Sequence, residues 1–270
     1  MKPFDPPLND TEVMNALPAF KVVATLTPGG QGAVFRCVDA NQNSCVLKIY
    51  GKNTELVRVE REIKKLRAIT SPYIVKLLDH GIVTIRSEVC RYSVVEFVEG
   101  TDLTQATGAW DDKRVRKVLH DVSHGIEAMW QNRVVHRDIK RANVMERATA
   151  GGYAIIDLGL AKHLDEKTVT MFGRTCGTIG YMSPEQANAR KGLTFRSDLY
   201  ALGVMMYELV TGVHPFGGNQ YTMAAGGRAA PIPLTKISKP VSELVAQMLE
   251  PSVLARPGSC ADVYNVCGGP

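Results

Sequence analysis

The sequence lacks any stretch of about 18 consecutive apolar residues, the length that a helix needs to cross a bilayer. Its most apolar segment, ALGVMMYELV, is interrupted by Glu208. The first ten residues, MKPFDPPLND, are broken by proline and aspartate and contain no apolar run of signal-peptide length. We therefore expect no membrane-spanning segment.

The sequence also lacks a pattern of cysteines typical of a disulfide-bonded protein. The six cysteines include no C-x-x-C pair and are scattered through apolar segments. A chain of 270 residues can bury a sizeable core and needs no disulfides to fold. We therefore expect reduced thiols and a cytoplasmic protein. The six are Cys37, Cys45, Cys90, Cys176, Cys260 and Cys267.

Basic runs and aromatic residues are scarce. Lys and Arg number 32 against 27 Asp and Glu, a formal net charge of +5, and no run of basic residues dominates. Aromatic residues make up only 7% of the chain. We therefore expect no nucleic-acid partner, because such a partner normally requires a dense basic surface. What remains is an ordinary globular protein of one large domain or two lobes.

The part of the chain up to about residue 97 is rich in predicted strands. Residues 1–17 are polar and rich in proline, and we interpret them as an N-terminal extension. Between residues 20 and 50, β-branched and apolar residues surround TPGGQG and DANQNS, which predicts strands joined by hairpins. SPYIVKLLDHGIV and RYSVVEFVEG are also strand-like. Residues 54–69 have a helical period, with an apolar face of Leu56, Val59, Ile63, Leu66 and Ile69.

Beyond Gly100 the pattern is mainly helical. An apolar stripe predicts a helix that leads into the sequence HRD, and GYAIIDLG predicts a short buried strand. SDLYALGVMMYELVTG predicts a buried helix, and VSELVAQML an amphipathic one. Residues 161–185 form a polar connection longer than usual, which indicates a functional segment. The stripe consists of Val115, Val118, Leu119, Val122, Ile126 and Met129.

Two features of the strand-rich part suit phosphate binding. Glycines in LTPGGQGAVF let backbone N–H groups approach a phosphate, although they also suit a plain hairpin turn. Lys48 lies near the end of an apolar strand, and Glu62 on the helical segment could pair with it. Such a pair would keep the lysine charged and able to hold a polyphosphate. Solvated surface charge is the alternative for both residues.

The sequence HRDIKRAN, residues 136–143, sets one carboxylate among three positive side chains and adds a carboxamide five residues after it. Asp138 can accept a proton from an attacking hydroxyl, and Lys140 can neutralise a phosphoryl group. Asn143 and Asp157 supply oxygen atoms, which Mg²⁺ prefers as ligands. We expect the hairpin sequence MERATAGGYAII to bring residue 157 back beside residue 143.

Taken in their order along the chain, the glycine cluster, Lys48, Glu62, HRDIKRAN and DLG resemble the motifs of the protein kinases, specifically Hanks-type serine/threonine kinases. The resemblance covers residues 20 to 265. The resemblance implies a bilobal α+β fold. A small antiparallel β-sheet N-lobe with the αC helix would span residues 18–97. A larger, mainly α-helical C-lobe would span residues 98–270, and residues 1–17 would precede both.

The resemblance also implies transfer of the γ-phosphate of ATP to Ser and Thr hydroxyls of protein substrates, with Mg²⁺ or Mn²⁺. Asp138 would orient the hydroxyl and Lys140 would act at the γ-phosphate. Asn143 and Asp157 would hold the metal, and Lys48 would pair with Glu62. The residues implied to bind ATP are Leu26, Thr27, Gly29, Gly30, Gly32, Val34, Val46, Lys48, Val95, Glu96, Val98 and Met145.

Regulatory residues are implied in the same way. Arg137 resembles the arginine that grips a phosphorylated activation segment. Candidates for autophosphorylation are Thr168, Thr170 and Thr175, with Thr170 the first choice and polar loop residues the alternative. Cys176 beside them is either redox-sensitive or an inert small side chain.

Structural residues complete the resemblance. His136 is expected to pack beneath the catalytic loop. Glu185, Asp198 and Arg256 match the family's anchors, and Arg256 is expected to pair with Glu185.

The sequence departs from the family pattern in several places. Thr27 replaces the first glycine of the loop, Gln31 replaces its usual apolar tip, and Arg141 replaces a common proline. DLG and SPE replace the more frequent DFG and APE. None of these changes removes a charged group that the chemistry needs. Two alternatives stay open, a pseudokinase that binds nucleotide as a scaffold and a small-molecule kinase of the same fold.

Overall fold

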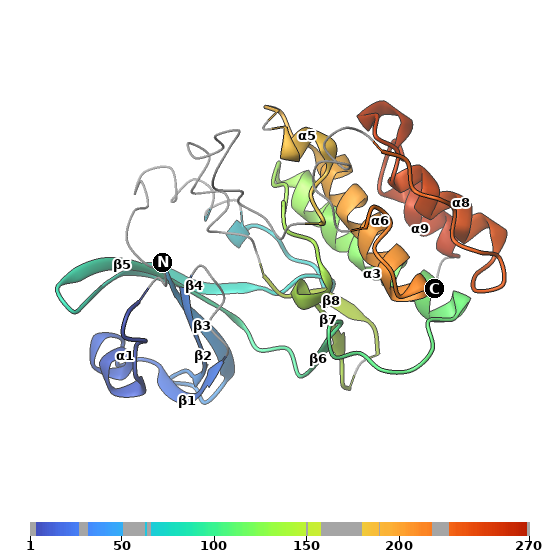
Figure 1. Ribbon diagram of the computed structural model, residues 1–270. Coiled ribbons are helices and arrows are strands. Elements are labelled where there is room, and N and C mark those ends of the chain that lie inside the picture. The colour runs from blue at the N-terminus through green and yellow to red at the C-terminus, as the bar shows by residue number, and fades with distance from the viewer. Residues whose placement is uncertain are drawn as a thin grey trace. The chain divides into compact units, whose positions relative to one another are not determined.

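The chain divides into two compact units (Figure 1). The N-terminal unit comprises Met1–Ala68 and Val75–Val98, and the C-terminal unit comprises Ile69–Ile74 and Glu99–Pro270. The computed structural model describes residues 4–26, 32–50, 63, 66–149, 151–157, 180–188, 190–217 and 227–268.

The N-terminal unit contains a five-stranded antiparallel sheet of order β1-β2-β3-β5-β4. The predicted strands and hairpins are therefore confirmed in this unit. The turn between β2 and β3 forms because the Asp39 carboxylate accepts the N–H groups of Asn41 and Asn43, both at 2.8 Å. The strands are β1 (Lys21–Leu26), β2 (Gly32–Val38), β3 (Ser44–Tyr50), β4 (Leu77–Ile85) and β5 (Glu88–Glu96).

One face of this sheet is covered by the N-terminal segment. Alternate residues of a strand point to opposite faces, so Leu47 and Ile49 point away from the face that carries Lys48. Leu47 and Ile49 are fully buried, in one core cluster with Val13 and Leu17 of the N-terminal segment. Residues interpreted from the sequence as an extension therefore contribute to the core.

Local hydrogen bonds explain why this segment forms the short helix α1 (Asp10–Ala16). Asn9 and Glu12 form a capping box, in which each side chain accepts the other residue's N–H at 3.0 Å. Arg86, in the turn between β4 and β5, donates to the Glu12 carboxylate at 2.6 and 2.8 Å. It also donates to the carbonyls of Pro6 and Pro7, at 2.7 and 3.1 Å. The segment is thus attached by both packing and polar contacts.

The predicted helix over residues 54–69 lies largely outside the described residues. Its described apolar positions Ile63, Leu66 and Ile69 are buried, as the expected apolar face requires.

The C-terminal unit combines a small antiparallel sheet of order β6-β7-β8 with a group of helices (Figure 1). Helix α3 contacts α6 and α9, and α6 contacts α8. The strands are β6 (Gly100–Asp102), β7 (Val144–Arg147) and β8 (Tyr153–Ile155). The α-helices are α3 (Asp112–Gln131), α5 (Pro184–Ala187), α6 (Phe195–Thr211), α8 (Lys239–Met248) and α9 (Ala261–Cys267), with 3-10 turns η1 (Arg141–Asn143) and η2 (Val253–Ala255).

Helices α3 and α6 confirm the two main helix predictions. Asp111 caps α3 by accepting the Arg114 N–H at 2.8 Å, and every member of the predicted apolar stripe is buried. Helix α6 begins at the N-cap Thr194 and ends at Gly212, whose φ of 79° is the left-handed conformation that glycine adopts readily. Its residues are buried on nearly every side, which places α6 in the middle of the unit's core.

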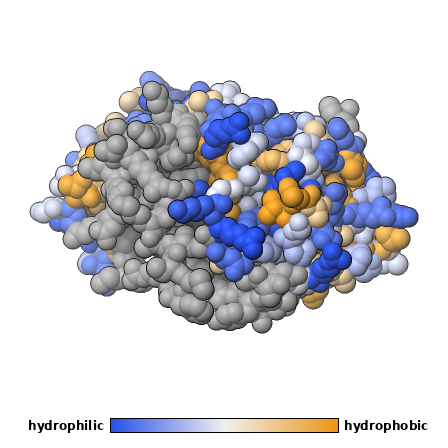
Figure 2. Space-filling model, turned by 90° about the horizontal axis from the view of Figure 1, so that it is seen from above, coloured by the Kyte–Doolittle hydropathy of each residue, from blue (hydrophilic) through white to orange (hydrophobic). Residues whose placement is uncertain are grey.

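The surface of the described residues is mixed. Figure 2 shows one face on which hydrophobic groups are separated by hydrophilic ones. Scattered apolar side chains of this kind are normal on a protein surface. No helix within the described ranges combines the length and the apolar character that crossing a membrane requires.

Candidate active site

The loop HRDIKRAN connects α3 to β7 and is held through its backbone by a buried carboxylate. Asp198 of α6 accepts the N–H groups of His136 and Arg137, both at 2.8 Å. Burial raises the pKa of Asp198, and the two N–H donors oppose that effect. Arg137 has a φ of 66°, an uncommon conformation for a residue with a side chain, which this anchoring sustains.

His136 links the loop to the DLG segment. Its ring is fully buried, and Nδ1 accepts the Asp138 N–H at 3.2 Å. The ring proton therefore lies on Nε2, which donates to the backbone carbonyl of Asp157. His136 holds two backbone segments in place, as expected for a residue that packs beneath the loop.

Asp138 lies within a set of polar groups of its own loop. Its Oδ2 atom is 3.0 Å from Lys140 Nζ and accepts a hydrogen bond of 3.2 Å from Asn143 Nδ2. The same Asn143 amide donates to the Asp138 carbonyl at 2.8 Å. Three residues that the sequence predicted to act together are therefore in contact.

The hairpin of β7 and β8 brings Asp157 next to this set, which confirms the expectation from MERATAGGYAII. Val144 pairs with Ile155, and Ile156 donates its N–H to the Asn143 carbonyl at 3.0 Å. Asp157 follows directly. The DLG aspartate and the loop asparagine thus sit on adjacent chain segments.

This pair of residues fits a magnesium ion. Both hydrogen bonds from Asn143 Nδ2 go to Asp138, so the side-chain oxygen of Asn143 points away from Asp138 and could bind the metal. Asp157 would add carboxylate oxygens. Among the described residues, no three His, Cys, Asp or Glu side chains form a ready-made metal site. Mg²⁺ usually takes one or two carboxylates together with substrate phosphates, and Asp157 with Asn143 could supply the protein ligands.

In the N-terminal unit, four of the residues implied to bind ATP share one face of the sheet. Val34 is the cross-strand partner of Lys48, and Val46 is the partner of Val95. Val46 and Lys48 are two residues apart on β3 and so point the same way. This is the face opposite the one that the N-terminal segment covers.

Gly32, the first residue of β2, requires its lack of a side chain. A Cβ atom there would lie 2.4 Å from the carbonyl oxygen of Ile49. The close approach of β2 and β3 at the end of the glycine cluster thus depends on glycine at this position.

Other implied ATP-binding residues are described less fully or not at all. Leu26 ends β1, Glu96 ends β5, Val98 is buried just beyond it, and Met145 is part of β7. Outside the described residues lie Thr27, Gly29, Gly30, Gln31, Glu62, Thr168, Thr170, Thr175 and Cys176.

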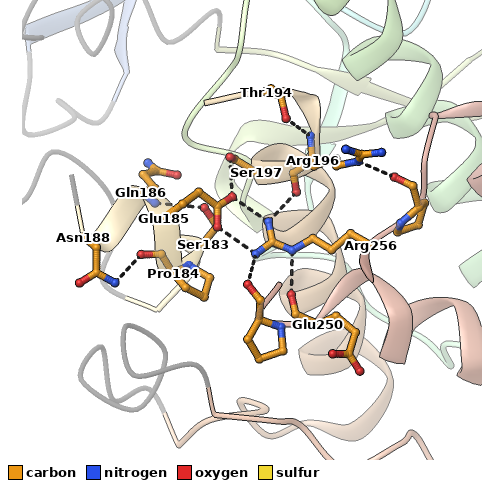
Figure 3. Close-up of polar contacts among 12 residues, drawn as sticks. Ser183, Pro184, Glu185, Gln186, Asn188, Thr194, Arg196, Ser197, Glu250 and Arg256 are labelled. Carbon is orange, nitrogen blue, oxygen red and sulfur yellow. Dashed lines mark hydrogen bonds and ion pairs between the residues drawn. The ribbon is translucent and has the colours of Figure 1, made fainter. Parts of the chain in front are cut away.

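The predicted pair of Arg256 and Glu185 is confirmed (Figure 3). The two side chains form a bidentate contact at 2.7 and 2.9 Å, and Ser197 adds a third donor to Glu185 at 2.7 Å. The remaining Arg256 N–H groups donate to the backbone carbonyls of Arg196, Glu250 and Pro251. All five donors of this buried guanidinium are thereby used.

This pairing determines the ionisation of Glu185. Burial alone would raise the pKa of Glu185, but the donors from Arg256 and Ser197 outweigh it and hold the pKa below its ordinary value. Helix α5 is therefore fixed to the segment before α9 by a charged pair inside the unit.

One further contact of the catalytic loop has no signal in the sequence. Gln186, next to Glu185, donates its amide to the Arg137 carbonyl at 2.9 Å. The catalytic loop is therefore also tied to α5, 49 residues away in sequence. A single carboxamide in a short helix has no periodicity that could have predicted this role.

Comparisons with known proteins agree with this geometry. Residues 20–265 match the protein kinase domain family. The serine/threonine-protein kinase PknB of Mycobacterium tuberculosis is 34% identical over 168 residues, which cover 60% of this chain and 26% of that protein. PrkC of Bacillus subtilis is 32% identical over 209 residues, which cover 74% of this chain and 31% of that protein. The aligned part is thus about a quarter to a third of each relative.

A solved structure supports the fold alone. The crystal structure of the Mycobacterium tuberculosis PknI kinase domain matches with a TM-score of 0.68 at 18% identity, over 92% of this chain and 95% of that one. The expected fold, an antiparallel N-terminal sheet followed by a mainly helical part, is confirmed. This chain belongs to the protein kinase domain family.

Proposed function

We propose that this chain transfers the γ-phosphate of ATP to Ser and Thr hydroxyls of protein substrates. The observation that carries the proposal is the set of contacts around Asp138. Lys140 and Asn143 bind its carboxylate, and Asn143 is joined by a backbone hydrogen bond to the residue before Asp157. A base, a cation and two oxygen ligands thereby lie within one unit.

The roles follow from the chemistry of each group. Asp138 would accept the proton of the substrate hydroxyl, and the contacts to its carboxylate keep it oriented for this. Lys140 would bind the transferring phosphoryl group. Lys48 would bind the other phosphates of ATP, and the apolar side chains of Val34, Val46 and Val95 would contact the base and sugar.

Asn143 and Asp157 would hold Mg²⁺, or Mn²⁺ in its place. When bound, the metal neutralises negative charge on the phosphates. The fixed amide of Asn143 and the hairpin of β7 and β8 would position these ligands before ATP arrives.

The test compares Asp138→Asn with a matched variant. In an assay with labelled ATP, Mg²⁺ and a generic protein substrate, we expect Asp138→Asn to lower the rate at least about 10²-fold, as for loss of a general base. Asp111→Asn is the control, because asparagine caps a helix as well as aspartate does. Equal rates in the wild type and Asp138→Asn would contradict the proposal.

The assay also separates the two alternatives. A pseudokinase would bind ATP in calorimetry but transfer no phosphate to protein, with Thr27 the residue that favours this alternative. A small-molecule kinase would leave protein substrates unlabelled while consuming ATP with a small alcohol as acceptor. Retention of Lys48, Asp138, Asn143 and Asp157 favours the active protein kinase.

We further propose autophosphorylation between residues 165 and 178, with Arg137 as the group that binds the new phosphate. Mass spectrometry of protein incubated with ATP and Mg²⁺ should find phosphate on Thr170 or a neighbouring threonine, and none in Asp138→Asn. Active protein with no phosphate in this range would rule the idea out.

A further inference from the structure

One positive charge of the catalytic loop has no role in the mechanism above. Lys140 pairs with Asp138, and Arg137 is held at its backbone by Asp198 and Gln186. Arg141 is the third basic residue of HRDIKRAN and lies three positions after Asp138. Three residues of extended chain span at most about 11 Å, so Arg141 is close to any substrate that reaches Asp138.

The guanidinium of Arg141 is anchored at one of its three nitrogens. Its Nε donates to the Leu103 carbonyl at 3.0 Å, and the Leu103 N–H donates to the Arg141 carbonyl at 3.1 Å. Within the described part of the chain, neither terminal amino group of Arg141 makes a hydrogen bond or an ion pair. Arg141 as a whole is only half-buried.

Tyr181 is one residue that the charge of Arg141 affects. Tyr181 donates its hydroxyl to Glu208 of α6. Burial, and then Glu208, raise the pKa of Tyr181, while the positive charge of Arg141 acts in the opposite direction. The charge of Arg141 therefore reaches Tyr181, which lies within the long connection of residues 161–185. Glu208 binds the tyrosine and not the arginine.

We propose that Arg141 binds an acidic side chain of the protein substrate, an Asp or Glu within a few residues of the phosphorylated Ser or Thr. A planar guanidinium with two unused amino groups matches the two oxygens of a carboxylate. A fixed Nε limits the loss of side-chain entropy when this contact forms. The inference rests on the proposed kinase activity and names a class of substrate for it.

The experiment is a peptide scan with purified protein. One Ser-containing peptide carries Asp, Asn or Lys in turn at each of the four positions on either side of the serine. For the wild type, we expect kcat/KM to be about fivefold higher with Asp than with Asn at one or two positions, the effect of an ion pair at a solvated surface. Lys at these positions should be the poorest.

Charge reversal assigns the preference to this residue. Arg141→Glu should reverse the order at the same positions, so that Lys exceeds Asp, whereas Arg141→Lys should keep Asp ahead. Arg133→Glu is the matched control, because Arg133 lies at the end of α3 with its guanidinium 5.2 Å from the Trp130 ring centroid. The control should keep the wild-type order.

A wild type that phosphorylates the peptides without preferring Asp would overturn the inference, and this result needs no variant to fold. An Arg141→Glu protein with the wild-type ratio of Asp to Lys peptides would overturn it as well, however much its overall rate falls. A wild type that phosphorylates no peptide and no protein would instead overturn the kinase proposal, and the role of Arg141 with it.

Discussion

At the scale of single residues, the C-terminal unit contains a buried pair of opposite charges. Arg256 and Glu185 are both buried, and each would be costly there alone because its desolvation would go uncompensated. Paired, they neutralise each other and use every donor of the guanidinium. The contribution of this pair to stability is therefore best tested by removing one partner.

We expect Arg256→Met to lower the free energy of unfolding by about 3–5 kcal/mol, because it leaves the Glu185 carboxylate buried without its partner. Arg228→Met is the matched control. Arg228 pairs with Glu250 at 3.3 Å but its side chain is 78% exposed, so its loss should change stability by less than about 1 kcal/mol. Urea unfolding at neutral pH measures both. Equal losses in the two variants would contradict this account of the pair.

Only some residues of this hydrogen-bonded network could be predicted from the sequence. Arg256, Glu185 and Asp198 were predicted because each belongs to a family motif. Ser197 and Gln186 were not, because a hydroxyl or an amide has no pattern that reveals a partner 12 or 49 residues away. The backbone carbonyls that accept hydrogen bonds from Arg256 could not be predicted either, because every residue has such a carbonyl.

At the scale of elements, α3 and α9 meet through a stack of rings. The His124 ring lies between Tyr264 of α9, at 4.0 Å and 9°, and Tyr73, at 5.1 Å and 17°. His120, one turn earlier on α3, meets His124 edge to face at 4.5 Å. These rings shield part of His124 from water, which disfavours its charged form.

We therefore predict a pH dependence of stability from His124. Burial and the charge of His120 lower the pKa of His124, with a smaller effect of Lys117, against the opposing charges of Glu127 and Asp121. A base whose pKa is lower in the folded state is protonated more readily in the unfolded one. Stability should thus fall as the pH falls from about 7.5 through the ordinary histidine value near 6.5, and level off below the folded pKa.

The measurement is urea unfolding of the wild type and His124→Phe at pH values from 8 to 5. Phenylalanine keeps a stacked ring but takes up no proton, so the variant should lose less stability over this range. Identical pH slopes in the two proteins would contradict the assignment to His124.

Helices whose apolar residues recur with a regular period could be predicted from that period, whereas a helix with few apolar residues could not. The stripe on α3 and the apolar run of α6 identified both helices before any coordinates. Helix α1 was missed, because Leu8, Val13 and Leu17 are widely spaced among proline and polar residues and give no helical period. Its capping box, Asn9-x-x-Glu12, is a local signature that could have identified its start, whereas its contact with Arg86 is an effect of tertiary structure that no local pattern reveals.

At the scale of the whole molecule, the N-terminal segment contributes to stability because it completes the core of its unit. Residue 20 is where the match to the family begins, so residues 4–19 lie outside it. Yet Leu8, Val13 and Leu17 are buried against the sheet. The stable N-terminal unit is therefore larger than the family match alone would suggest.

Two valines test this conclusion. Val13 is fully buried in α1, and Val23 on β1 is 54% exposed. We expect Val13→Ala to lower the free energy of unfolding by about 2 kcal/mol, from lost burial and the cavity left behind. Val23→Ala should change it by less than about 0.5 kcal/mol. Thermal and urea unfolding of both variants give the comparison, and equal effects would mean that the segment is not part of the core.

The two hydrogen bonds that Asp198 accepts from backbone N–H groups of the catalytic loop have a practical use. Because Asp198 holds the catalytic loop through its backbone, the Asp138 side chain can be exchanged while the path of the loop stays the same. A protein carrying Asp138→Asn should therefore still capture nucleotide and target together and then stall. If this inactive variant is mixed with a cell extract and crosslinked, it should retain the cellular substrates that the active protein releases.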